Sequence, residues 1–196
     1  MPPPDTADDP KMDRGAPGPY LAGMTAHPLV LDDLSCPAPR TPLGTTWELV
    51  SDRVMGGVSD GTLTRTTLAG RMALRLSGSV SLENNGGFLQ MALDLRPDGS
   101  ALDARAFTGV ELDVFGNDQS YNLHLRTADV IRPWQSYRLA FTAPAQWSTL
   151  RLPFSDVTPH RVDAPFDPAT LRRIGIVAIG RAFRADIAIA RIALYP

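Results

Sequence analysis

The sequence predicts an all-β fold, an antiparallel β-sandwich of the jelly-roll type. Many short segments alternate apolar and polar side chains with a period of two, which is typical of strands with one buried face. Clusters of Gly, Pro, Asp or Asn separate these segments at a spacing of about ten residues, as in sandwiches and jelly rolls. Long helical patterns are absent, which argues against βαβ units and a parallel sheet.

The chain divides into two parts by composition. Residues 1–27 are rich in Pro and Asp and contain too few apolar side chains to offset the entropy of ordering, so we expect a disordered tail. Residues 28–196 have the length and pattern of one β-sandwich domain. Within it we expect strands at residues 29–31, 46–50, 72–76, 88–95, 110–115, 121–126, 137–141, 150–152, 174–179 and 187–194.

Two local patterns refine this expectation. Near the C-terminus, Ile187 and Ile189 share one parity and Ile192 and Leu194 the other, so we expect a β-bulge near Arg191. The one short helix predicted covers residues 167–173. Its Asp suits the N-cap, its Pro the first position and its two arginines the last turn.

Charge and cysteine content exclude several classes of protein. The chain has 19 basic and 21 acidic side chains, so it lacks the basic field that holds nucleic acid. Cys36 is the only cysteine, which rules out an intrachain disulfide and a thiolate zinc site and fits a reducing compartment. No apolar run approaches the roughly 18 residues of a transmembrane helix, and the N-terminus does not resemble a secretory signal. We therefore expect a cytoplasmic protein without a transmembrane segment.

Two sequence segments combine a Gly pair with charged or amide side chains. In residues 51–59 the Gly pair follows Asp52 and Arg53. Two interpretations are open for these residues: they contact a ligand, or they stabilise the turn. We favour the turn, with Asp52 accepting backbone N–H groups in the turn formed by Gly56 and Gly57 and with Arg53 pairing with Asp52. Residues 83–88 pose the same choice for a carboxylate and two amides that could hold sugar hydroxyls or a hard cation. These candidate ligand residues are Glu83, Asn84 and Asn85.

The segment 121–126 carries the most suggestive polar face. Its alternation places Asn122, His124 and Arg126 on one side of a strand and apolar side chains on the other. If residues 127–134 form a hairpin loop, Trp134 and Tyr137 return near this face.

An aromatic plane beside Arg and His donors is a common arrangement for holding a sugar or an anion. The candidate binding residues here are His124, Arg126, Trp134 and Tyr137, and His160 and Arg161 are further candidates that the sequence does not place. The alternative is an ordinary solvated face with Trp134 packed against the sheet edge.

Catalytic signals are weak. The sequence has no Gly-x-Ser-x-Gly turn and no His-Glu-x-x-His helix, and its three histidines are scattered. The Gly pairs do not lie between a strand and a helix, so they do not indicate a nucleotide site. We assign no catalytic residue, no metal ligand and no cofactor, and expect a protein that is not an enzyme.

The two Gly-bearing segments also resemble a known family. The word from Trp47 to Ser59 and the word from Glu83 to Phe88 are similar to the two signatures of the complex I intermediate-associated protein 30 family. The resemblance continues through residues 107–110, 121–126 and 137–141 and covers roughly residues 29–195. It implies a galactose-binding-domain-like β-sandwich. Segments 132–137 and 171–175 resemble bacterial members.

The resemblance also implies a function. Mitochondrial members of this family act as assembly chaperones for respiratory complex I. We therefore expect a non-catalytic protein-binding or assembly module whose partner could be a subunit of a respiratory membrane complex. The alternative is a module that binds a carbohydrate or a small anion through the polar face around His124, Arg126 and Trp134.

Overall fold

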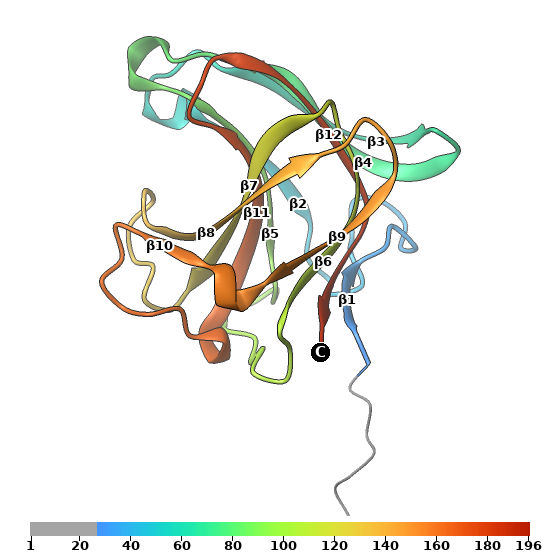
Figure 1. The fold of residues 1–196 in the computed structure, drawn as a ribbon, viewed down its shortest axis with the longest axis vertical. Coiled ribbons are helices and arrows are strands. Elements are labelled where there is room, and N and C mark those ends of the chain that lie inside the picture. The colour runs from blue at the N-terminus through green and yellow to red at the C-terminus, as the bar shows by residue number, and fades with distance from the viewer. Residues whose placement is uncertain (1–26) are drawn as a thin grey trace, which may run out of the picture.

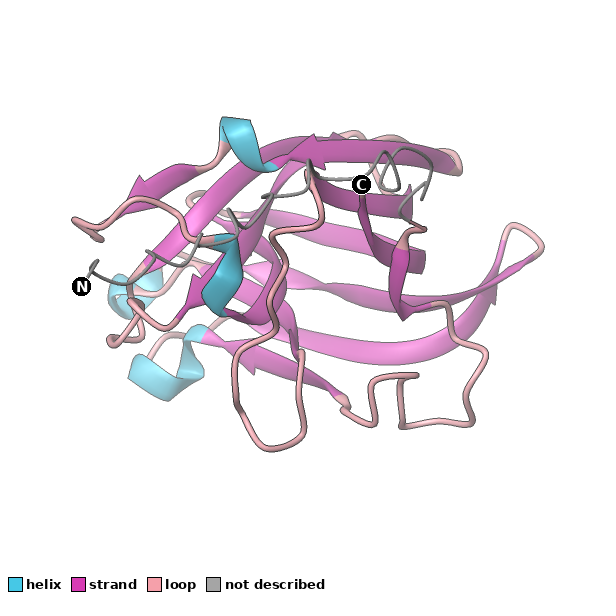
Figure 2. Cartoon of the chain, turned by 90° about the horizontal axis from the view of Figure 1, so that it is seen from below, coloured by secondary structure: helices cyan, strands magenta, loops and turns pink. Residues whose placement is uncertain are grey.

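The protein is a β-sandwich of two antiparallel sheets, as expected. The computed structural model describes residues 27–196 (Figure 1), so the tail predicted for residues 1–27 lies outside the described residues except for its last position. Within the described part, two six-stranded sheets form the two layers visible in Figure 2. We call them the back sheet and the front sheet.

The back sheet has the strand order β3-β4-β12-β6-β9, with β1 also paired to β12. The long β12 pairs with β4 along its first half and with β1 near its end. Its register against β6 shifts between Ile189 and Arg191, which confirms the predicted bulge. The strands are β1 (Leu29–Asp32), β3 (Asp60–Leu68), β4 (Arg71–Val80), β6 (Gly109–Phe115), β9 (Ser148–Pro153) and β12 (Phe183–Tyr195).

The front sheet has the strand order β10-β8-β7-β11-β5-β2. Each neighbouring pair is antiparallel, with β7 and β11 at the centre of the sheet. The strands are β2 (Trp47–Ser51), β5 (Phe88–Asp94), β7 (Gln119–Thr127), β8 (Ser136–Ala143), β10 (Thr158–His160) and β11 (Leu171–Ile179).

The core lies between the sheets and is built from the apolar residues of each alternation. On β7, Tyr121, Leu123 and Leu125 are fully buried, and on β12 Ile187 faces them from the back sheet with no exposed surface. Burial of such side chains is the main favourable contribution to folding. Because successive side chains of a strand point to opposite faces, the residues between them on β7 lie on the outer face of the front sheet.

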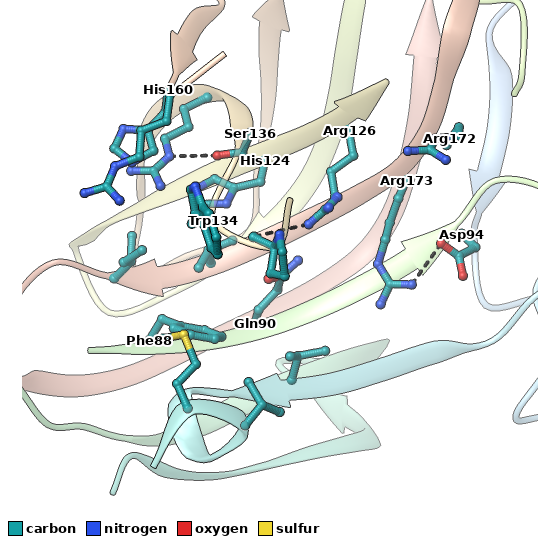
Figure 3. Close-up of a pocket in the computed structure, with 18 of the residues that line it drawn as sticks. Phe88, Gln90, Asp94, His124, Arg126, Trp134, Ser136, His160, Arg172 and Arg173 are labelled. Atoms are coloured by element: carbon teal, nitrogen blue, oxygen red, sulfur yellow. Dashed lines mark hydrogen bonds and ion pairs between the residues drawn. The ribbon is translucent and has the colours of Figure 1, made fainter. Parts of the chain in front are cut away.

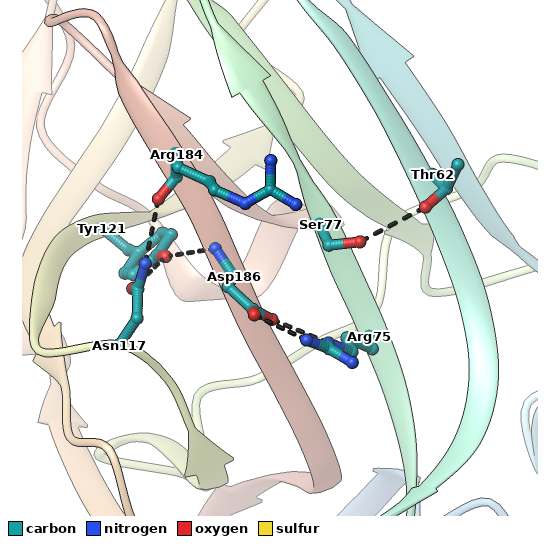
Figure 4. A network of polar contacts seen from close by, with 7 residues as sticks. All are labelled: Thr62, Arg75, Ser77, Asn117, Tyr121, Arg184 and Asp186. Carbon is teal, nitrogen blue, oxygen red and sulfur yellow. Dashed lines mark hydrogen bonds and ion pairs between the residues drawn. The ribbon is translucent and has the colours of Figure 1, made fainter.

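A buried tyrosine links the two sheets (Figure 4). The hydroxyl of Tyr121 on β7 donates to Asn117 Oδ1 at 2.7 Å and accepts from the backbone N–H of Asp186 on β12 at 2.9 Å. Asn117 in turn donates to the backbone carbonyl of Arg184 at 2.9 Å. Burial raises the pKa of Tyr121 to about 12, so this hydroxyl keeps its proton and its donor role.

Helical structure among residues 27–196 is limited to four short 3-10 turns: η1 (Asp52–Met55), η2 (Glu83–Asn85), η3 (Phe154–Asp156) and η4 (Pro168–Thr170). The N-cap prediction is confirmed, because Asp167 accepts from the N–H of Ala169 at 2.9 Å. The predicted extent of 167–173 is wrong. Residues 171–173 begin β11, since Arg173 pairs with Asp94 on β5 and with Arg126 on β7.

Two strands, β3 and β10, were not predicted. In β3 threonines occupy many of the positions where a buried strand would have aliphatic side chains, and β10 has only three residues. No helix in residues 27–196 is long and apolar enough to span a membrane.

Candidate functional site

A groove with a volume of about 1110 Å³ lies over the outer face of the front sheet (Figure 3). Its floor is formed by β5, β7, β8 and β11. Its walls come from η1, through Val54 and Met55, and from the loop after β7, through Pro133 and Trp134. The lining also includes Phe88, Gln90, Asp94, His124, Arg126, Ser136, Arg138, His160, Arg161, Arg172, Arg173 and Val177.

The polar face predicted on residues 121–126 forms the centre of this floor. His124 lies opposite Arg138 on β8 and opposite Gly175 on β11. Arg126 is one step further along β7, and its neighbour on β11 is Arg173. The structure thus brings His124 and Arg126 into one groove together with Trp134, as Figure 3 shows.

Hydrogen bonds hold the loop that carries Trp134. Gln135 accepts from the N–H groups of Ile131 and Arg132 and donates to the carbonyl of Arg161 at 2.9 Å, which ties this loop to the segment after β10. Arg126 reaches up from the floor to the carbonyls of Arg132 and Pro133 at 3.2 and 3.3 Å. The indole of Trp134 remains 49% exposed, so its surface is available to a ligand.

Tyr137 is a correction to the predicted site. Its side chain is fully buried, and its hydroxyl donates to the carbonyls of Ala164 and Pro165 at 2.9 and 3.1 Å. On β8 it alternates with Ser136 and Arg138, which line the groove, so period-two geometry directs Tyr137 into the core. It has no contact with the groove.

His124 is the most unusual group on the floor. Its side chain is 9% exposed, and its Nε2 atom is buried without a hydrogen-bond partner in residues 27–196. Burial, followed by the positive charges of Arg138, His160 and Arg126, lowers the pKa of His124 to about 3. The imidazole is therefore neutral at physiological pH, and a buried polar atom of this kind calls for a partner.

One arginine of the floor is neutralised by carboxylates. Arg173 pairs with Asp94 at 2.8 Å and with Glu48 on β2 at 2.7 Å. Burial opposes the charged form of Arg173, but these two hydrogen bonds outweigh it and raise its pKa. Sequence reasoning missed Arg173 because it assigned residues 171–173 to a helix, although strand parity with Ile174 and Ile176 would have placed it on the polar face.

The other arginines of the groove bind neutral groups. Arg138 donates to Ser136 Oγ at 2.9 Å, and Arg172 donates to the carbonyls of Thr127 and Val130 at 3.0 and 3.1 Å. Burial and nearby arginines lower the pKa values of Arg126 and Arg138. Within residues 27–196, none of these guanidinium groups forms a salt bridge with a carboxylate.

A glycine flattens the middle of the floor. A Cβ atom at Gly175 would lie 2.0 Å from Nε2 of Gln90, so the Gln90 side chain occupies the space above this position. Gln90 and Val177 face each other across β5 and β11 and extend the floor toward η1. The result is an amide group exposed to the groove beside His124.

Asp52 lies outside the groove and joins the two signature segments. Its side chain is fully buried and accepts from the N–H and Oγ–H of Ser59 and from the N–H groups of Gly87 and Phe88. Burial opposes its ionisation, but the hydrogen bonds from Ser59 and Gly87 lower its pKa overall. The turn interpretation is therefore correct in kind, but the donors lie beyond the Gly56–Gly57 pair.

The glycines beside Asp52 leave room for its carboxylate. A Cβ atom at Gly57 would lie 2.4 Å from Asp52 Cγ, and one at Gly86 would lie 2.5 Å from Asp52 Oδ2. The expected pairing of Arg53 with Asp52 is wrong: Arg53 donates to Asp60 at 2.9 Å on the surface and does not line the groove. The Gly residues of both signature segments are therefore needed to make room for the buried Asp52 carboxylate and its hydrogen bonds.

Of the other three candidates, only one lines the groove. Asn85 borders it at the η1 side. Asn84 donates to the carbonyl of Gly56 at 3.3 Å, which adds a second link between the signature segments. Glu83 is exposed, and its backbone N–H donates to Ser81 Oγ.

The described residues contain no constellation that indicates a reaction. Neither His124 nor His160 hydrogen-bonds a carboxylate or a hydroxyl group within residues 27–196. The same part of the chain holds no group of three or more His, Cys, Asp or Glu side chains placed to bind a metal ion. The groove presents aromatic side chains, amide groups and several cations.

Several solved structures with the same fold are carbohydrate-binding modules. The chain superposes on the family 11 module of the cellulase Lic26A-Cel5E from Clostridium thermocellum with a TM-score of 0.66 at 13% identity, covering 86% of this chain and 94% of that one. The complex of a family 11 module from this organism with a β-1,3-1,4-mixed-linked tetrasaccharide gives a TM-score of 0.62 at 13% identity, with coverages of 86% and 95%.

A further structural match is the family 30 module of the Clostridium thermocellum cellulase Cel9D-Cel44B, with a TM-score of 0.60, 15% identity and coverages of 86% and 96%. These likenesses show the galactose-binding-like sandwich fold. No curated protein matches the chain significantly by sequence. The sequence model named complex I intermediate-associated protein 30 matches residues 40–188, a span that includes both signature segments and most of the groove. The chain therefore belongs to the complex I intermediate-associated protein 30 family.

Proposed function

We propose that this protein is a non-catalytic binding module whose groove on the front sheet holds an oligosaccharide. The groove itself carries the proposal. It is open, it has a volume of about 1110 Å³, and it presents Trp134 above a floor of amide, imidazole and guanidinium groups. Aromatic planes pack against sugar rings, and fixed donors pair with hydroxyl groups.

Two further observations support this function. Trp134 is half exposed although it is large and apolar, and two hydrogen bonds fix its loop: Gln135 accepts from the N–H of Arg132, and Arg126 donates to the carbonyl of Arg132. A preformed site loses less entropy on binding. The similar solved structures are carbohydrate-binding modules, one of them holding a tetrasaccharide, although identities of 13–15% show only the fold.

The test is a glycan array with neutral and acidic oligosaccharides, followed by calorimetry on the best ligand. Trp134→Ala should weaken binding by about tenfold or more, because aromatic anchors contribute strongly to binding. Its melting temperature should stay close to that of the native protein, because the side chain lies on a surface loop. Met72→Ala, which removes a half-exposed apolar side chain from β4 of the back sheet, is the matched control. An array without any ligand that depends on Trp134 would refute the proposal.

A second candidate function is assembly of a membrane complex through a protein partner. The family description supports it, together with the apolar rim of the groove. Val54 and Met55 on η1 line the groove and are 74% and 59% exposed. Exposed apolar side chains grouped in this way are typical of protein contact sites. The expected partners are subunits of a complex I-like respiratory complex.

Affinity capture from the source organism tests this candidate. Native protein should recover the same membrane-complex subunits reproducibly, and a Val54→Ser/Met55→Ser variant should lose them, since both residues are exposed and contribute little to folding. Equal recovery by the double variant, or recovery of nothing above background, would count against the assembly role.

A further inference from the structure

The charge of the groove is strongly one-sided. Among residues 27–196 a single carboxylate, that of Asp94, lines the groove, and it is already bound to Arg173. Glu48, at the edge of the sheet, pairs with the same arginine. The remaining arginines of the lining are Arg126, Arg138, Arg161 and Arg172. The net charge of the whole chain is −2, so this concentration of cations is local.

Two of these arginines flank the unpartnered histidine. Arg138 is the direct neighbour of His124 on β8, Arg126 follows on β7, and His160 lies on β10 beyond β8. Within the described residues the Nε2 atom of His124 is buried without a hydrogen-bond partner, and the residue as a whole is 9% exposed. An anion placed beside His124 would meet two half-buried guanidinium groups at once.

The free-energy cost of burying these arginines also favours an anionic ligand. A half-buried cation without a counter-ion loses solvation and gains no Coulomb energy in return. The lowered pKa values of Arg126 and Arg138 report this cost, which arises first from burial and then from neighbouring arginines. A carboxylate in the groove would offset it for both residues.

From this cluster we infer that the groove selects an oligosaccharide that carries carboxylate groups, with Arg138, Arg161 and Arg126 holding a carboxylate beside His124. The inference rests on the proposed function, since it names the class of glycan that the module binds. An extended acidic sugar fits better than a small free anion, because Trp134 and Gln90 add a ring-stacking plane and an amide along the same groove. The occupant is therefore recognised through charge and through sugar rings together.

Calorimetry with matched ligands tests the inference. Short oligouronates, each with four sugar units or so, are compared with their carboxyl-reduced forms, which keep the rings and remove only the charge. The acidic ligand should bind at least about tenfold more tightly, and its affinity should fall as sodium chloride is raised. Inorganic phosphate and a pentaglutamate peptide serve as probes of charge without sugar.

Variants of the groove arginines test whether these residues cause the preference for the acidic ligand. Arg138→Met keeps the aliphatic part of the side chain, and Arg161→Asn suits the positive φ of 56° at this position. Each should weaken binding of the acidic ligand by about tenfold and should weaken binding of the carboxyl-reduced ligand clearly less, because a guanidinium group loses an ion pair with the first ligand and only a hydrogen bond to a hydroxyl group with the second. Arg184→Asn, which removes an exposed arginine from β12 of the back sheet, should change neither.

The outcomes separate the two proposals. Equal affinity for acidic and reduced ligands, or a preference for the reduced ones, would overturn this inference and leave the oligosaccharide function in place. Tighter binding of the pentaglutamate peptide or of phosphate than of every oligouronate would also overturn it, in favour of an acidic protein segment or a free anion. Absence of binding by all sugars, charged and neutral, would remove both proposals.

Discussion

Removal of the Asp52 carboxylate should destabilise the protein more than removal of the Tyr121 hydroxyl or of the Asp60 carboxylate. In Asp52→Ala the backbone N–H groups of Ser59, Gly87 and Phe88 lose their acceptor, at 3.0, 2.6 and 3.3 Å in the native protein. Two of these three contacts are fully buried. Each buried donor left unpaired costs about 1–3 kcal/mol, so we expect a total loss of about 3–5 kcal/mol.

Urea and thermal unfolding measure this loss. For a domain of this size, 1 kcal/mol corresponds to about 2–4 °C, so the melting temperature should fall by about 6–20 °C. Asp60→Ala is the matched control, since it removes a surface carboxylate that is 78% exposed and paired only with the exposed Arg53. Such pairs contribute about 0–1 kcal/mol. If the free energies of unfolding of Asp52→Ala and Asp60→Ala differ by less than about 1 kcal/mol, the structural role assigned to Asp52 is wrong.

Three other predictions concern the core and the groove. Because the pKa of His124 is about 3 in the folded protein and near 6.5 when unfolded, the unfolded chain binds more protons between these pH values, and the free energy of unfolding should fall by about 2 kcal/mol from pH 6.5 to pH 5. Urea titrations of native protein and His124→Gln at both pH values check this, and an identical pH dependence would contradict it. Tyr121→Phe should lower the free energy of unfolding by about 1–3 kcal/mol in urea titrations, because it leaves Asn117 Oδ1 and the N–H of Asp186 without their partner. An unchanged free energy of unfolding would show that this link between the sheets is dispensable. Gly175→Ala should displace the flexible Gln90 side chain and weaken oligosaccharide binding in calorimetry with little change in melting temperature, whereas a large loss of stability would show that the floor cannot adjust.

Strand alternation predicted the fold and the centre of the groove. The period of two on residues 121–126 placed Tyr121 in the core and His124 and Arg126 on the outer face, because a strand with one buried face admits only one such pattern. The same rule applied to residues 136–138 would have separated Tyr137 from the groove and added Arg138 to it. The alternation of side chains within one strand is local information, and it is sufficient to decide which side chains of β7 and β8 face the core and which face the groove.

The remaining features depend on contacts between distant residues. Asp52 meets Gly87 across 35 positions of sequence, so residue types alone could suggest a buried turn but not its donors. The start of β11 was misjudged because Asp167 and Pro168 are a strong helix-start signal, whereas pairing with β5 and β7 ends the helix after one turn. Tertiary pairing overrides local propensity in this way throughout β proteins.

The three tryptophan indoles report directly on where the oligosaccharide binds. Trp134 lines the groove, whereas the indole N–H groups of Trp47 and Trp147 are engaged elsewhere, with Asp32 at 2.8 Å and the carbonyl of Leu68 at 3.1 Å. In ¹H–¹⁵N spectra recorded during titration with the tightest oligosaccharide, the Trp134 indole signal should move and the other two should stay in place. Movement of the Trp47 or Trp147 signal with a stationary Trp134 signal would contradict the proposal that the oligosaccharide binds in the groove.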